Sequence, residues 1–302
     1  MLRVTSLSVK KPLPVKRPGR SAVVCSLSSE ICAGTSRRLI LGASFSCVLA
    51  SGCPSPSFST TLSLTSEEKT IVENAFKECV TAVKAPAVLR VLFHDAGTFD
   101  ISSMDGGANA SVRFELDRPE NKGLKRGLSC IEKVYSVVQT TSAGQKLSFA
   151  DTIALAAAYA VGSTKGPRIE MPIGRADATE ADPEGRLPDE TAPISELKSN
   201  FKQKGFTVKE FVALCGSHTL GNKGFGDPAV FDNEYFKILL NQPWNDPSNE
   251  MGKMIGLPSD RVLITDEECL ELVHMYAKDK DLFFADFSSA LVKLSALGTA
   301  LR

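Results

Sequence analysis

The chain has 302 residues, of which 43% are hydrophobic and 23% are charged, a composition typical of an ordinary globular protein. Lysine plus arginine and aspartate plus glutamate are equal at 35 each, so the formal net charge is zero. This balance argues against a large basic surface, and we expect neither nucleic acid nor an anionic membrane as a partner.

Residues 1–64 are expected to form a targeting segment and linker. Residues 1–29 contain six basic residues and no acidic residue, which is typical of an organellar transit peptide. Within 36–51, Arg37 and Arg38 precede an apolar run that resembles a twin-arginine export signal and is too short to span a membrane. We therefore expect a chloroplast protein, with the stroma and the thylakoid lumen both open.

Residues 65–302 are expected to form one mostly α-helical domain. A helix that begins near residue 66 would place four residues on one face: Ile71, Ala75, Cys79 and Val83. Pro86 and Pro119 favour helix starts, because proline is well suited to the first helical turn. Residues 148–162 are almost continuously small or apolar, which predicts a helix buried on several sides.

Local signals predict the ends of several elements. Thr207 with Glu210, and Thr265 with Glu268, have the spacing of a capping box at a helix start. Gly298 is expected to cap the last helix. The segment 168–174 is the clearest candidate for a short strand.

The eight cysteines include no CxxC pair, which argues against a zinc finger or a dense disulfide framework. Four of them follow residue 65, namely Cys79, Cys130, Cys215 and Cys269. We expect these four to be free thiols, with one disulfide among them left open.

Only three histidines are available for imidazole chemistry. His94 follows Arg90 by four residues, so both side chains share one helical face. This pair indicates either a pocket for proton transfer and charge stabilisation or an exposed polar face. His218 follows an apolar helix and is either an axial metal ligand or a satisfied core histidine. His274 has no polar constellation around it and is expected to be structural or exposed.

Eight motifs in order, from about residue 66 to the C-terminus, resemble those of class I plant haem peroxidases. The likeness is greatest to the plant ascorbate peroxidase-related group. The motifs lie at residues 85–100 ("APAVLRVLFHDAGTFD"), 106–124, 147–151, 174–188, 214–221 ("LCGSHTLG"), 231–236 ("FDNEYF"), 257–260 ("LPSD") and 283–287.

This resemblance implies the haem peroxidase fold, with one haem b between a distal and a proximal helical lobe. On the proximal side, His218 would be the axial ligand of the iron and Asp260 its carboxylate partner. The substrates would be hydrogen peroxide and a small reductant.

On the distal side, His94 matches the acid–base residue and Arg90 the residue that stabilises developing charge. Phe93 matches the aromatic residue that packs over the haem. Asn121 matches the asparagine that orients the distal histidine, and Glu115 a helper of that network.

The chain also departs from the ascorbate peroxidase pattern. The proximal tryptophan is absent, because the only tryptophan is Trp244, beyond "FDN". A protein radical is therefore not expected there. The segment after His218 is shortened and lacks the arginine that binds ascorbate. Ala82 and Lys84 replace two further residues of that binding site, so ascorbate is not expected to be the specific donor.

The resemblance gives little support for a bound cation. Thr219 and Asp232 match parts of a potassium loop whose other ligands fall in the shortened segment. Asp95 matches a calcium ligand of secreted plant peroxidases, but the other ligands are missing, so it is expected to be structural. Neither potassium nor calcium is expected.

Two hypotheses follow. The first is a chloroplast haem peroxidase that detoxifies hydrogen peroxide. The second is a non-catalytic, peroxidase-like haem-binding, structural or sensor protein that has kept the fold. The retained histidines favour the first, and the sequence leaves the oligomeric state open.

Overall fold

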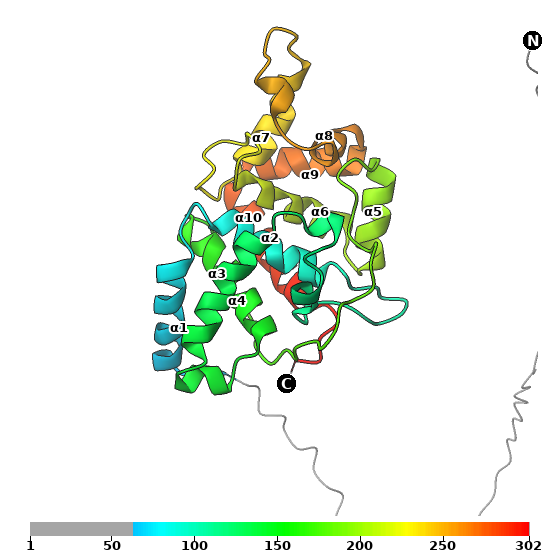
Figure 1. The fold of residues 1–302 in the computed structure, drawn as a ribbon. Coiled ribbons are helices and arrows are strands. Elements are labelled where there is room, and N and C mark those ends of the chain that lie inside the picture. Colours follow the sequence, from blue (N-terminus) through cyan, green and yellow to red (C-terminus); the bar gives the residue numbers. More distant parts are fainter. Residues whose placement is uncertain (1–62, 302) are drawn as a thin grey trace, which may run out of the picture. The chain divides into compact units, whose positions relative to one another are not determined.

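The computed structural model describes residues 63–301, and within this range the fold is helical, as expected (Figure 1). The predicted targeting segment lies almost entirely outside the described residues. The helices are α1 (Ser66–Cys79), α2 (Ala85–Ala96), α3 (Lys125–Val138), α4 (Phe149–Ser163), α5 (Ile194–Gln203), α6 (Val208–Cys215), α7 (Glu234–Asn241), α8 (Pro258–Arg261), α9 (Glu267–Lys278) and α10 (Lys280–Ser295). Across residues 63–301, no helix is long and apolar enough to cross a bilayer.

Helix α2 lies in the middle of the fold, and the other helices group on its two sides (Figure 1). On one side it packs against α3 and α4, and α1 packs against α3. On the other side α6 packs against α9 and α10, and α7 packs against α9. The alanine-rich α4 is buried over most of its length, as predicted, because its small side chains let α2 approach closely.

Side chains cap the starts of two helices for which a capping box was predicted, with one difference from expectation. The predicted box of Thr207 and Glu210 caps α6, so that prediction is confirmed. The box predicted for Thr265 is wrong, because Asp266 accepts the Cys269 amide at 3.1 Å and caps α9. An aspartate one residue later supplied the same capping oxygen, and spacing alone could not choose between them.

The first predicted helix is correct in its position, but of the four residues predicted for its inner face only Ala75 is buried. Helix α1 buries Val72, Ala75 and Phe76 and ends at Cys79. Val83 therefore lies beyond the helix and is 72% exposed. Pro86 occupies the first turn of α2 as predicted, whereas Pro119 begins only a 3-10 turn (Pro119–Asn121), and α3 starts later.

The predicted strand at 168–174 is not formed, and at its end the backbone turns toward the Asp151 side chain. The amides of Gly174 and Arg175 both donate to the Asp151 carboxylate, at 3.0 and 3.1 Å. The C-terminal prediction is also shifted, since α10 is capped by Ala296 and Gly298 lies in the following turn. Gly298 has φ of 68°, and a Cβ there would collide with the carbonyl oxygen of Gly106.

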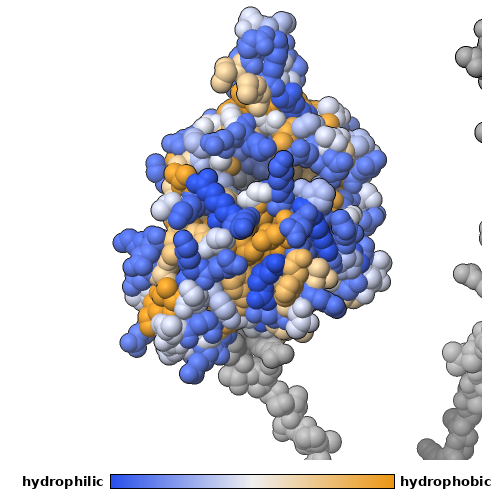
Figure 2. Space-filling model, in the orientation of Figure 1, coloured by the Kyte–Doolittle hydropathy of each residue, from blue (hydrophilic) through white to orange (hydrophobic). Residues whose placement is uncertain are grey.

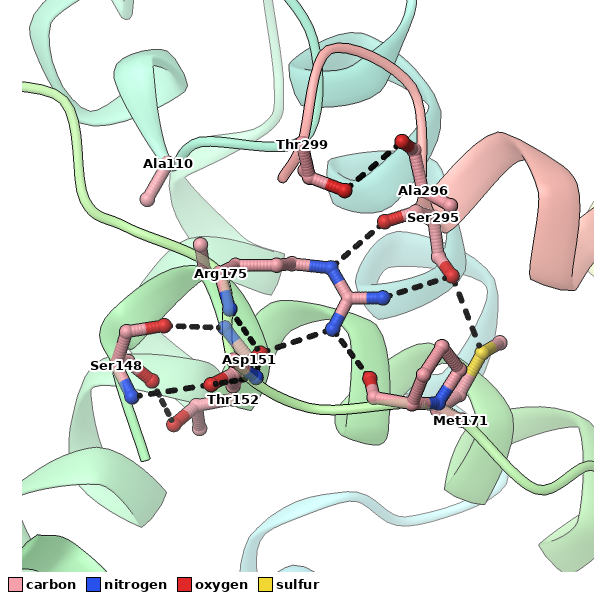
Figure 3. Close-up of polar contacts among 12 residues, drawn as sticks. Ala110, Ser148, Asp151, Thr152, Met171, Arg175, Ser295, Ala296 and Thr299 are labelled. Carbon is pink, nitrogen blue, oxygen red and sulfur yellow. Dashed lines mark hydrogen bonds and ion pairs between the residues drawn. The ribbon is translucent and has the colours of Figure 1, made fainter. Parts of the chain in front are cut away.

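A buried ion pair joins α4 to the end of α10 (Figure 3). Arg175 Nη1 lies 2.9 Å from Asp151 Oδ1, and both side chains are at most 1% exposed. Arg175 Nε donates to the Ser295 carbonyl oxygen at 2.6 Å, and Nη2 donates to Ser295 Oγ at 2.9 Å. One guanidinium therefore holds together three segments that are far apart in the sequence.

Candidate functional site

A cavity of about 990 Å³ is lined by residues of α2 and α6 and by the segments that follow α6 and precede α8. In the space-filling view, apolar side chains are visible near the middle of the face and hydrophilic ones border them (Figure 2). Of the predicted site residues, five line this cavity: Arg90, Phe93, His94, His218 and Asp260. The structure therefore brings together residues that are up to 170 positions apart in the chain.

On the distal side, α2 carries Arg90 and His94 one turn apart, as their spacing predicted. Arg90 Nε donates to His94 Nε2 at 3.0 Å. The Arg90 guanidinium also donates to the carbonyl oxygens of Lys122 (2.8 Å) and Glu120 (3.0 Å). These bonds hold the cation beside the histidine and at the cavity wall.

Asn121 fixes the tautomer of His94. Asn121 Nδ2 donates to the carbonyl oxygen of Glu115 at 2.9 Å, so Oδ1 is the atom that faces the imidazole. His94 Nδ1 lies 2.7 Å from this oxygen and must carry the hydrogen. Nε2 is then left unprotonated, as a proton acceptor beside Arg90. Glu115 thus supports the network through its backbone, while its carboxylate accepts the Asp182 amide at 2.9 Å.

The electrostatic surroundings keep His94 neutral. Burial, reinforced by the positive charge of Arg90, lowers the pKa of His94 to about 4, against the opposing effect of the Asn121 hydrogen bond. A neutral imidazole with a free Nε2 can accept a proton at physiological pH.

This pKa predicts the pH profile of the reaction with peroxide. The rate constant of the haem-loaded protein should be nearly constant between about pH 5 and pH 8. It should fall as the pH drops through about 4, because protonation of His94 removes the base. Stopped-flow measurement across this range checks the profile, and a midpoint near the ordinary histidine value would contradict it.

On the proximal side, a 3-10 turn (Gly216–Thr219) directly after α6 carries His218. His218 Nδ1 lies 2.7 Å from Asp260 Oδ1, and Asp260 is only 1% exposed. Burial alone would raise the pKa of Asp260, but the adjacent His218 and the hydrogen bonds from His218, the Leu257 amide and the Tyr235 hydroxyl hold it below its ordinary value. The Asp260 carboxylate therefore stays ionised and accepts the hydrogen of Nδ1, which leaves Nε2 of His218 free to coordinate a metal.

The donor set fits a haem. Within residues 63–301, no group of three or more histidine, cysteine or acidic side chains could chelate a bare metal ion. A single free imidazole nitrogen would instead suit the iron of a haem, because the macrocycle supplies most of the other ligands. The apolar walls, which include Leu89, Phe93 and Phe201, suit a flat hydrophobic group.

The remaining predicted residues fall outside the hydrogen-bonded centre. Phe93 is half-buried and packs against Phe201 with ring centroids 6.1 Å apart. Asp95 accepts the amides of Ala110 (2.9 Å) and Val112 (3.2 Å), which is a structural role. Trp244 lies in a 3-10 turn (Pro243–Asn245) beneath the Arg261 guanidinium.

The sequence prediction missed Tyr235, which is fully buried at the start of α7. Its hydroxyl donates to Asp260 Oδ1 at 2.9 Å, the same oxygen that faces His218. Its ring packs edge-on against Phe225, with centroids 4.6 Å apart. The motif "FDNEYF" contains this tyrosine, but nothing in its spacing indicates a contact with a residue 25 positions later.

Comparison with known proteins agrees with this geometry. The family model described as Peroxidase matches residues 68–279. The chain is 50% identical over 224 residues to "Putative L-ascorbate peroxidase 6" of Arabidopsis thaliana, covering 74% of this chain and 67% of that protein. It is 38% identical over 228 residues to "L-ascorbate peroxidase 2, cytosolic" of the same species, covering 72% and 86%. It is also 38% identical over 226 residues to "Probable L-ascorbate peroxidase 3, peroxisomal" of Oryza sativa subsp. japonica, covering 71% and 73%.

Proposed function

Since this chain belongs to the peroxidase family, as a class I plant haem peroxidase related to the ascorbate peroxidases, we propose that it removes hydrogen peroxide in the chloroplast using haem b and a small donor, without specificity for ascorbate. The observation that carries the catalytic part is one cavity with an unprotonated distal nitrogen on His94 and a free proximal nitrogen on His218.

When bound, the haem would supply the iron that binds peroxide, and it would hold the oxidising equivalents taken from peroxide until the donor reduces them. His94 Nε2 accepts a proton from peroxide and returns one to the departing oxygen, acting first as base and then as acid. Arg90 stabilises the negative charge that develops as the O–O bond breaks, an effect of about 3–4 kcal/mol for a preorganised donor. Because Arg90 Nε bonds to His94 Nε2, peroxide must displace this bond to deliver its proton.

The same residues weigh against a non-catalytic role. Arg90, His94, Asn121, His218 and Asp260 are all present, and each makes the contact that its role requires. A protein that had lost catalysis would have no need of the neutral, oriented imidazole at His94.

The segment after His218 supports a donor other than ascorbate. Between Gly221 and Asp227 the only basic side chain is Lys223, which is exposed and lines the cavity. Phe225 turns inward and is 1% exposed, and its side chain has no polar group that could bind a donor. A planar bidentate partner for an anionic ring is therefore missing from this segment.

The donor preference can be tested on the full chain after titration with haemin. A Soret band should appear, and the protein should then use hydrogen peroxide to oxidise guaiacol with a higher kcat/KM than ascorbate, because losing one charged contact lowers the binding of ascorbate by about tenfold. His218→Ala serves as the control for specific haem ligation. Faster turnover with ascorbate would refute the donor proposal, and the absence of haem uptake would refute the catalytic one.

The chloroplast assignment is supported by the basic, acid-free leader at residues 1–29. Fusion of residues 1–64 to a fluorescent protein should direct it into chloroplasts. Retention in the cytosol would contradict the assignment.

A further inference from the structure

The Asp260 carboxylate receives three hydrogen bonds. His218 Nδ1 and the Tyr235 hydroxyl both point at Oδ1, at 2.7 and 2.9 Å. The Leu257 amide donates to Oδ2 at 2.7 Å. His218 therefore shares its acceptor oxygen with the tyrosine.

The packing around Tyr235 keeps its hydroxyl on this oxygen. Tyr235 is 0% exposed, and its ring lies edge-on to both Phe225 (4.6 Å between centroids) and His218 (6.1 Å). Gly224 and Gly226 flank Phe225 with φ of 85° and 90°, conformations that favour glycine, and the loop turns Phe225 inward between them. Because Tyr235 is buried among these rings, its hydroxyl has no access to water and bonds to Asp260 instead.

Close approach at Gly256 completes this arrangement. A Cβ at Gly256 would lie 2.8 Å from Phe225 Cζ and 3.4 Å from Asp260 Oδ2. The segment before α8 therefore packs directly on Phe225, which holds Asp260, Tyr235 and Phe225 as one unit. The short glycine-rich segment after His218 is the part of the chain that makes this unit possible.

We propose that Tyr235 is a positioning residue that sets how strongly Asp260 attracts the Nδ1 hydrogen of His218, and thereby how much electron density His218 gives to the haem iron. The proposal rests on ligation of the haem by His218. Hydrogen bonds to one carboxylate oxygen compete, because each donor withdraws electron density from it. The tyrosine hydroxyl thus weakens the pull of Asp260 on His218, and second-shell partners of this kind tune a metal centre.

The direction of the effect follows. In Tyr235→Phe the ring remains, but Oδ1 has lost a donor and becomes a stronger acceptor for His218. More electron density on His218 stabilises ferric over ferrous iron. The midpoint potential of the haem should shift to a more negative value, and the iron–histidine stretching frequency of the ferrous protein should rise.

Tyr276→Phe is a matched control. Tyr276 is also 0% exposed, and its hydroxyl donates to a carboxylate, Asp286 Oδ2, at 3.0 Å. Its removal should leave both the potential and the frequency unchanged. Spectroelectrochemistry and resonance Raman spectroscopy of the haem-loaded full chain measure these quantities without reference to turnover.

The outcomes separate this proposal from the proposed function. If the unmodified protein takes up no haem, the proposed function fails. If Tyr235→Phe takes up haem and neither quantity moves beyond the Tyr276→Phe control, the tuning role fails. A positive shift of the potential, or loss of haem binding in Tyr235→Phe, would also overturn the tuning role. In an Asp260→Ala background Tyr235→Phe should have no further effect, and a persistent effect would show that Tyr235 does not act through Asp260.

Discussion

Replacing His94 by alanine should lower the rate constant for reaction with hydrogen peroxide by about 10²–10⁴-fold, the usual contribution of a positioned acid–base residue. The imidazole is held by Asn121 at 2.7 Å and kept neutral by burial, so no neighbouring group can replace it as base. Arg90 stays cationic and cannot accept a proton. Haem uptake should be retained, because His218 belongs to a different element and keeps its bond to Asp260.

His274→Ala is the control for this experiment. His274 is exposed on α9 and is not among the residues that line the cavity. Its removal should leave both the Soret titration and the stopped-flow rate constant unchanged. A His94→Ala variant that reacts with peroxide as fast as the unmodified protein would refute the acid–base role.

Local rules predicted the parts of the site that lie within one element. Arg90 and His94 are four residues apart, and helical geometry alone places them on one face, where they form a 3.0 Å hydrogen bond. The helix that carries them could also be predicted from the sequence, since Pro86 marks its start and apolar residues recur at helical spacing. The burial of that face could not be predicted, because it depends on what the rest of the chain packs against it.

Contacts between distant segments required the family resemblance or the structure itself. Asn121 and Asp260 were assigned by their motifs, and in the structure each lies 2.7 Å from a ring nitrogen of one of the two histidines. Tyr235 belongs to a matched motif, yet its bond to Asp260 depends on how α7 and α8 pack. The strand predicted at 168–174 did not form, and its last amide, that of Gly174, bonds to the Asp151 side chain rather than to a neighbouring strand.

Arg175 shows most clearly what the sequence could not reveal. It lies in the motif "GRADATEADPEGRLP", where an arginine gives no sign of burial, and permanently charged side chains are seldom buried. The structure buries it completely and surrounds it with Asp151, Ser295 and the Pro172 carbonyl oxygen. A charge is tolerated there because all these acceptors replace the water that it loses.

Arg175→Met should therefore destabilise the fold by about 3–5 kcal/mol, because it keeps a similar volume but leaves the Asp151 carboxylate buried without its cation. Urea unfolding followed by circular dichroism measures this change. Arg168→Met is the matched control, since its ion pair with Glu73 is 79% and 57% exposed and such pairs contribute at most about 1 kcal/mol. Asp151→Asn in the Arg175→Met background should recover part of the loss, because it removes the uncompensated charge while keeping an oxygen for the backbone amides of residues 174 and 175. Equal losses for Arg175→Met and Arg168→Met would mean that the buried pair does not hold α4 to the end of α10.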